Sequence, residues 1–327
     1  MLQREPADFS QPLPKLLEAW CADLIGALDG PLQDISGGGW RRLRYSGGEE
    51  WPAAVPAWER RKFLGRVGGR PVLLKYAGLG EVGDQKLALA RTLHSEGLTP
   101  QPLGLVHGFI AELWLEDAAG LPPEDEPVSE IARYLSTRAR LLPAPSDSGA
   151  SIEELLAMAR RNLTLELGGD SVAALDHWRA RLPELERRVV RVRTDNKLDR
   201  QEWLRARGGP LIKTDALDHH QAHDLVGCQP LEWDVAGAIA EFDLDQKGAA
   251  FLVRQLGDQG ARIDSELLRF CHVAYLAFRI GRARLAEGVS DREDGVRLSR
   301  RAADYARRLR CLLQLSRAAT RPESLVD

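Results

Sequence analysis

Cysteine is scarce in this chain, and its few copies lie far apart. The four cysteines among 327 residues are Cys21, Cys228, Cys271 and Cys311, and no two of them form a Cys-x-x-Cys pair. This spacing excludes a zinc ribbon and a dense disulfide framework. A reducing compartment, the cytoplasm, is therefore the expected location.

Long apolar runs, a leader-like start and a strong excess of one charge are also missing. No stretch of about 18 apolar residues occurs, so we expect no transmembrane helix. The segment from Met1 to Pro14 is mostly polar and lacks the basic start and apolar core of a secretory signal. A formal net charge of -3 and a pI near 6.2 give no electrostatic reason to expect nucleic acid or an anionic membrane as a partner.

The chain begins with a strand-rich part. After a helical pattern over Lys15–Leu28, two short strand patterns flank Gly68-Gly69, which is the composition of a two-residue hairpin turn. Another helical pattern and two further strands follow. The four strand patterns are Arg61–Val67, Arg70–Tyr76, Leu103–Val106 and Phe109–Leu115, and the second helix is Asp84–Glu96.

The rest of the chain is mostly helical. An acidic connector that contains glycine and proline runs from Glu116 to Pro123. The helical patterns beyond it are Ile152–Leu167, Val172–Arg181, Val235–Phe242, Ser265–Ala286 and Val296–Leu315. The order predicts a two-lobed α+β protein with an N-terminal lobe over residues 1–116, including a helical extension, and a helical C-terminal lobe over 117–327.

The stretch from Thr194 to Asp215 combines a polar loop with a tight hairpin. Glu202 and Asp215 flank two predicted strands, Trp203–Arg207 and Pro210–Thr214, which a Gly-Gly turn joins. A hairpin places its two ends side by side, so the two carboxylates are expected to lie close enough to share one divalent cation.

The order of these patterns resembles the aminoglycoside phosphotransferase and choline kinase branch of the protein-kinase-like fold. The resemblance covers roughly residues 60–245, from the strand that ends at Lys75 to Trp233-Asp234-Val235-Ala236-Gly237. It implies a nucleotide, ATP, with Mg²⁺, and an acceptor that carries a hydroxyl group, most readily a small molecule. Fold-level similarity does not choose the acceptor.

The resemblance also implies roles for residues of the N-terminal lobe. Lys75 matches the strand lysine that holds nucleotide phosphates in the family, and Glu81 or Asp84 is its candidate partner on the following helix. Trp114 and Leu115 fall at the family's hinge, where backbone groups bind adenine.

The family's catalytic loop reads His-Gly-Asp, four residues, then Asn. Alignment of Glu202 with that metal-binding Asn places Asp195-Asn196 at His-Gly and Lys197 at the catalytic Asp. Asp215 then matches the second metal ligand, and Asp234 matches an aspartate that ties the loop to the next helix. Lys197 is the departure, because a charged ammonium cannot accept the proton of the substrate hydroxyl.

Three interpretations of Lys197 are open. Asp195 or Asp199, each two residues away, supplies the missing carboxylate of an atypical phosphotransferase. Alternatively, Lys197 itself neutralises charge on the transferred phosphoryl group, since this chemistry depends chiefly on positioning and electrostatics. In the third interpretation the loop is inactive and the protein is a nucleotide-binding pseudokinase or scaffold.

A cluster of histidines suggests a rival enzyme class. His219 and His223 are four residues apart, which would put both on one face of a helix and suit a transition metal. Metal-dependent phosphohydrolysis is the corresponding activity. The segment directly follows a predicted strand, where kinase-like proteins have a loop, so hydrogen-bonded loop histidines are the competing interpretation.

Overall fold

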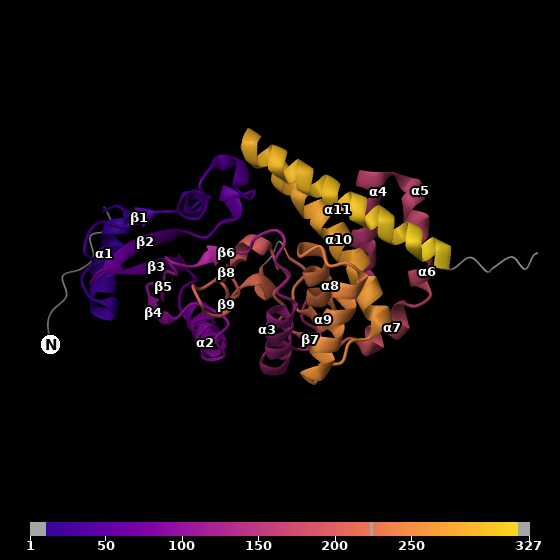
Figure 1. Cartoon of the computed structure of the whole chain (residues 1–327), viewed down its shortest axis with the longest axis horizontal. Helices are drawn as coiled ribbons and strands as arrows, with labels where there is room; N and C mark the ends of the chain where they lie inside the picture. The colour runs from indigo at the N-terminus through magenta and orange to yellow at the C-terminus, as the bar shows by residue number, and fades with distance from the viewer. Residues whose placement is uncertain (1–10, 223–224, 320–327) are drawn as a thin grey trace, which may run out of the picture. The chain divides into compact units, whose positions relative to one another are not determined.

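A computed structural model of the chain describes residues 11–222 and 225–319 (Figure 1). The described chain divides into two compact units. The N-terminal unit comprises the described residues up to Pro122 together with Gln201–Asp218. The C-terminal unit comprises Pro123–Arg200 and the described residues from His219 onward. Most strands lie in the N-terminal unit and most helices in the C-terminal unit, which is the α+β organisation that the sequence predicts.

The N-terminal unit is built on an antiparallel five-stranded sheet. Its order is β1-β2-β3-β5-β4, with β1 at Gln33–Asp34, β2 at Lys62–Val67, β3 at Arg70–Tyr76, β4 at Pro102–Val106 and β5 at Phe109–Leu113. The turn between β2 and β3 is formed by Gly68 and Gly69, which have φ values of 55° and 77°. Two positive φ values in a two-residue turn match the right-handed twist of the strands it connects, and glycine adopts them without strain.

Two helices pack with this sheet. Helix α1, Leu13–Ile25, buries Leu17 and Cys21 in a core cluster with Phe63 and Leu74 of the sheet. Helix α2, Glu81–Ser95, places Leu87 in a second cluster with Ala77 and Ile110. Because neighbouring side chains of a strand point to opposite faces, Leu74 and Lys75 of β3 face opposite sides of the sheet. Lys75, the last residue but one of β3, therefore faces away from the core cluster that contains Leu74.

A second sheet of the same unit has the order β6-β8-β9. Its strands are β6 at Ala119–Gly120, β8 at Trp203–Arg205 and β9 at Leu211–Lys213. The expected hairpin between Trp203 and Thr214 therefore forms, with shorter strands than predicted. The backbone N–H of Lys213 donates to the carbonyl of Leu98 at 2.9 Å, which fastens the hairpin to the segment after α2.

The C-terminal unit is helical. Its longer helices are α3 at Val128–Leu141, α4 at Ile152–Leu167, α7 at Leu182–Arg188, α8 at Leu231–Glu241, α9 at Gln246–Asp258, α10 at Ser265–Glu287 and α11 at Arg292–Ala319. One buried cluster draws on α4, α8, α10 and α11. Strands β7, Arg191–Val192, and β10, Gln229–Pro230, form a small antiparallel ladder. None of the helices within the described residues has both the length and the apolarity needed to cross a bilayer.

The helix predicted over Val172–Arg181 is present only as short helical pieces. The segment contains two four-residue helices, α5 at Gly169–Val172 and α6 at Asp176–Arg179, separated by a 3-10 turn. The buried residues Val172, Leu175 and Trp178 recur every third position, which is the repeat of a 3-10 helix.

The division into units differs from the predicted boundary at residue 116. The connector up to Pro122 and the segment Gln201–Asp218 group with the N-terminal unit. The reason is strand pairing, because β6 of the connector pairs with β8, which pairs in turn with β9.

Candidate functional site

The candidate functional residues form two groups, one within each unit. In the N-terminal unit the centre is an ion pair between Lys75 and Asp215. The ammonium group of Lys75, at the end of β3, donates to Oδ1 of Asp215, just after β9. Burial lowers the pKa of Lys75, but the negative charges of Asp215, Asp218 and Glu112 raise it by more. The pKa therefore lies above its ordinary value. Lys75 is therefore a permanent cation.

The strand carboxylate Glu112 lies near this pair and was not found by sequence reasoning. It stands on β5 opposite Leu73, on the same face of the sheet as Lys75. The pKa of Glu112 is raised to about 7 in total. Burial and the charge of Asp215 raise it by more than the charge of Lys75 lowers it. The candidates on α2, Glu81 and Asp84, are exposed.

Helix α2 instead contributes a buried cation. Its Lys86 is buried, and the ammonium nitrogen lies 3.2 Å from Oδ2 of Asp218. Lys86 was not predicted as a site residue, because a lysine within an apolar helical pattern usually has its ammonium group in solvent.

The two proposed metal ligands are close together. Glu202 and Asp215 each offer a carboxylate oxygen, and these oxygens lie within 4.8 Å of each other. Hard oxygen donors of this kind fit Mg²⁺. Each carboxylate also has an ammonium partner: Lys75 contacts Asp215, and Nζ of Lys213 lies 2.6 Å from Oε2 of Glu202. The two carboxylates suit a divalent cation, and two lysines already balance the negative charge of these carboxylates.

The predicted hinge residues are engaged through their backbones. The N–H of Trp114 donates to the carbonyl of Pro71 at 3.1 Å. The carbonyl of Leu115 accepts a hydrogen bond from Nη1 of Arg44 at 2.7 Å, and the guanidinium of Arg44 lies 4.0 Å from the centroid of the Trp114 ring. Trp114 and Leu115 are thus held by a cation–π contact with Arg44 and by hydrogen bonds to Arg44 and to strand β3, and their hinge role remains a prediction.

In the C-terminal unit, Asp234 of α8 determines the conformation of the polar loop. Its carboxylate accepts hydrogen bonds from the backbone N–H groups of Asp195, at 2.7 Å, and Asn196, at 2.9 Å. Burial and the nearby charge of Asp195 raise the pKa of Asp234 to about 6, although Arg138 and the two backbone bonds lower it. The backbone of the loop is thereby anchored two residues before Lys197.

The backbone at Asn196 has a left-handed conformation, with φ of 64°. Glycine, and to a lesser degree asparagine, adopts this region readily. The Asn196 side chain supports it by donating from Nδ2 to the carbonyls of Gly227, at 2.8 Å, and His219, at 3.3 Å.

Asp195 is enclosed. Its side chain is 0% exposed, the Tyr134 hydroxyl donates to Oδ2, and Nδ1 of His219 lies 2.7 Å from Oδ1. Burial raises the pKa of Tyr134 well above its ordinary value, so the phenol keeps its proton and remains a donor. Both oxygens of Asp195 are used within the protein.

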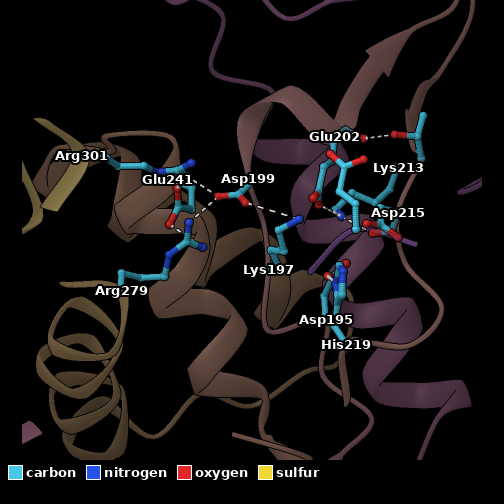
Figure 2. Close-up of polar contacts among 12 residues, drawn as sticks. Asp195, Lys197, Asp199, Glu202, Lys213, Asp215, His219, Glu241, Arg279 and Arg301 are labelled. Carbon is cyan, nitrogen blue, oxygen red and sulfur yellow. Dashed lines mark hydrogen bonds and ion pairs between the residues drawn. The ribbon is translucent and has the colours of Figure 1, made fainter. Parts of the chain in front are cut away.

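Asp199 belongs to a buried charge network (Figure 2). Its Oδ1 lies 2.5 Å from Nη2 of Arg279 on α10 and also contacts Arg301 on α11. Both arginines also pair with Glu241, at 3.1 Å for Arg279 and 2.7 Å for Arg301. Burial raises the pKa of Asp199, but the charges of Arg279, Arg301 and Lys197 lower it well below its ordinary value.

Lys197 lies between Asp195 and Asp199 in the sequence and pairs with Asp199. Its Nζ is 3.7 Å from Oδ2 of Asp199, and 22% of its side chain is exposed, against 3% for Asp199. Within the loop the lysine is the accessible member of the pair, and the carboxylate is the buried one.

Only part of the histidine cluster lies within the described residues. His219 begins a 3-10 turn, His219–Gln221, and its ring is directed to Asp195. His223 lies outside the described residues. The described part of the cluster therefore agrees with the competing interpretation, in which these are hydrogen-bonded loop histidines.

Comparison with known proteins identifies the fold. The sequence matches no protein-family model and no curated protein. Among solved structures, choline kinase LicA from Streptococcus pneumoniae matches with a TM-score of 0.53 at 15% identity, over 76% of this chain and 89% of that one. The type I macrolide 2'-phosphotransferase matches at 0.54 and 16%, over 89% and 96%. The choline kinase of Cryptosporidium parvum Iowa II matches at 0.55 and 11%, over 92% and 97%.

The chain has their kinase-like fold. The resemblance predicted from sequence is confirmed at this level, and identities this low establish the fold alone. Asp234 accepts hydrogen bonds from the loop backbone at Asp195 and Asn196, and its match to the structural aspartate of the family remains a prediction. The roles of Lys75, Glu202, Asp215 and the loop residues remain predictions.

Proposed function

We propose that this chain is a kinase-like nucleotide-binding protein that has lost the carboxylate base of phosphoryl transfer to a hydroxyl. The observation that carries the proposal is the anchoring of Asp195 and Asn196 by Asp234. It supports the register in which Lys197 stands at the catalytic aspartate of the family.

The nucleotide-binding part of the proposal rests on the N-terminal unit. Lys75 is a permanent cation paired with Asp215, and a lysine so placed suits the phosphates of ATP. Glu202 and Asp215 would hold Mg²⁺, which when bound neutralises charge on the phosphate oxygens. LicA, one of the matching proteins, has been solved in complex with AMP.

The loss of the base rests on the C-terminal unit. A general base needs a lone pair within reach of the hydroxyl proton, and a charged ammonium has none. Asp195 is enclosed by Tyr134 and His219, and Asp199 is committed to Arg279 and Arg301. Both carboxylates that could replace the missing aspartate are therefore engaged in other contacts.

A second function is supported by the exposure of Lys197. Phosphoryl transfer depends on positioning and charge stabilisation more than on proton removal, and a partly exposed ammonium could neutralise charge on a phosphoryl group. In that case the chain is an atypical ATP-dependent phosphotransferase that acts on a small hydroxyl-containing acceptor.

Calorimetric titration with a non-hydrolysable ATP analogue tests nucleotide binding, with Lys75→Met and Asp215→Asn as site variants. Lys15→Met is the control, because Lys15 lies on the exposed surface and its ammonium group pairs with its helix neighbour Glu18. We expect binding by the wild type and the control, with loss of about tenfold or more in each site variant. Equal binding by all four proteins contradicts the assignment.

A further inference from the structure

Lys213 is an ammonium group enclosed at the proposed metal site, and sequence reasoning did not identify it. It is the last residue of β9, its side chain is 0% exposed, and its register partner is Trp203 of β8. The ammonium nitrogen lies 5.8 Å from the centroid of the Trp203 ring. An ammonium is buried this completely only where close oxygen partners replace water.

The oxygen partners of Lys213 come from both ends of the hairpin. Its Nζ lies 2.6 Å from Oε2 of Glu202 and also contacts the backbone carbonyl of Asp215 (Figure 2). These are the two residues proposed to hold Mg²⁺. A positive charge that belongs to the chain thus already links the two segments that a divalent cation would link.

The local charge is balanced without a metal. The carboxylates of Glu202 and Asp215 are matched by the ammonium groups of Lys213 and Lys75. A divalent cation placed between these carboxylates gains their attraction but meets the repulsion of two nearby positive charges. Its net contribution is smaller here than at a pair of unmatched carboxylates.

The charge of Lys213 also acts on a nucleotide bound at this site, although the side chain itself is enclosed. Phosphate groups need positive charge close by, and a fixed ammonium group supplies it without the ordering of a free ion. We propose that Lys213, held by Glu202, takes over part of the electrostatic role of Mg²⁺, so that nucleotide binding at this site does not require a divalent cation. This inference rests on the proposed nucleotide site.

The test measures ATP affinity by calorimetry in EDTA and in excess Mg²⁺. For the wild type we expect the two dissociation constants to agree within about threefold. For Lys213→Met we expect binding at least about tenfold weaker in EDTA, with most of it restored by Mg²⁺, because the ion then pairs with Glu202. Lys213→Arg should keep the behaviour of the wild type, because it keeps the charge.

A matched control comes from the same unit. Lys86→Met removes another buried ammonium, one that pairs with Asp218, and it should leave the ratio of the two affinities unchanged. If Lys213 were only a structural residue, Lys213→Met would lower stability, as Lys86→Met would, without changing the ratio of the ATP affinities in EDTA and in Mg²⁺. The double variant Glu202→Gln/Lys213→Met removes both charges together, and it keeps the test open should Lys213→Met fail to fold.

Two results separate the possible failures. Wild-type protein that binds ATP only with Mg²⁺ overturns the role of Lys213 and leaves the nucleotide site intact. Wild-type protein that binds no nucleotide under either condition overturns the proposed function and this inference together.

Discussion

Nη2 of Arg279 lies 2.5 Å from Oδ1 of Asp199, and both side chains are almost completely buried. The contact joins helix α10 to the polar loop that carries Lys197. Because the carboxylate is neutralised by Arg279 and Arg301 together, it stabilises the loop and is poorly suited to accept a proton.

Loss of this carboxylate should destabilise the fold. Asp199→Ala leaves Arg279 and Arg301 with Glu241 as the remaining carboxylate of the network, and removal of one member of a buried ion pair costs about 3–5 kcal/mol. Chemical denaturation measures the free energy of unfolding. Glu166→Ala is the control, because its partner Arg284 is 39% exposed, against 5% for Arg279, and this pair should be worth no more than about 1 kcal/mol. A similar loss in both variants would speak against the network.

The two aspartates of the site should differ in their effect on ligand binding. Asp215→Ala removes the partner of Lys75 and a proposed metal ligand, whereas Asp199→Ala changes a contact within the C-terminal unit. We expect Asp215→Ala to weaken nucleotide binding more, by about tenfold or more, as measured by calorimetry at a temperature where both variants are folded. Equal effects, or none, contradict the metal assignment.

Stability should depend on pH through Glu112. Burial raises the pKa of Glu112 to about 7 from an ordinary value of 4.5, so the folded state binds the proton more tightly than the unfolded state does. The contribution of protonated Glu112 to the free energy of unfolding is therefore fully present below pH 4.5 and is lost as the pH rises through 7. Each pKa unit between the folded and unfolded states is worth about 1.4 kcal/mol. The free energy of unfolding of Glu112→Gln, compared with wild type, should rise from pH 4.5 to 8. A difference that stays constant across this range contradicts the assignment.

The left-handed backbone at Asn196 gives a matched pair of variants. Asn196→Gly and Asn196→Ala both remove the side-chain bonds to Gly227 and His219, but only alanine pays for a φ of 64°. We expect Asn196→Ala to be less stable than Asn196→Gly by about 1–2 kcal/mol, measured by denaturation. Equal stability would mean that the loop relaxes to another conformation.

Local patterns predicted much of the fold. The hairpin of β2 and β3, with its Gly-Gly turn, follows from alternation and turn composition, and helix α4 has the predicted bounds Ile152–Leu167. Helix α3 was missed because its buried face includes Tyr134 and Arg138, which do not read as an apolar stripe. Their burial depends on Asp195, a residue 61 positions from Tyr134.

The site was harder to predict, since its partners are distant in sequence. Lys75 and Asp215, 140 residues apart, were each found through the family resemblance, but the resemblance named Glu81 or Asp84 as the partner of Lys75 and did not predict this pair. The partners of Asp199 lie 80 and 102 residues away in the last two helices, where the resemblance is unspecific. Lys213 looked like an ordinary charged strand end, and only the packing of the hairpin encloses it.

The most direct measurement of the central claim is phosphoryl transfer from ATP to a panel of small hydroxyl acceptors by the wild type, Lys197→Met and Lys197→Asp, with nucleotide binding checked in each protein. The account predicts that wild type and Lys197→Met bind ATP but form no phosphorylated acceptor above background. Lys197→Asp, which restores a carboxylate, is the only one expected to gain transfer. Phosphorylated acceptor formed by the wild type and lost in Lys197→Met would contradict the account and assign Lys197 a direct part in catalysis.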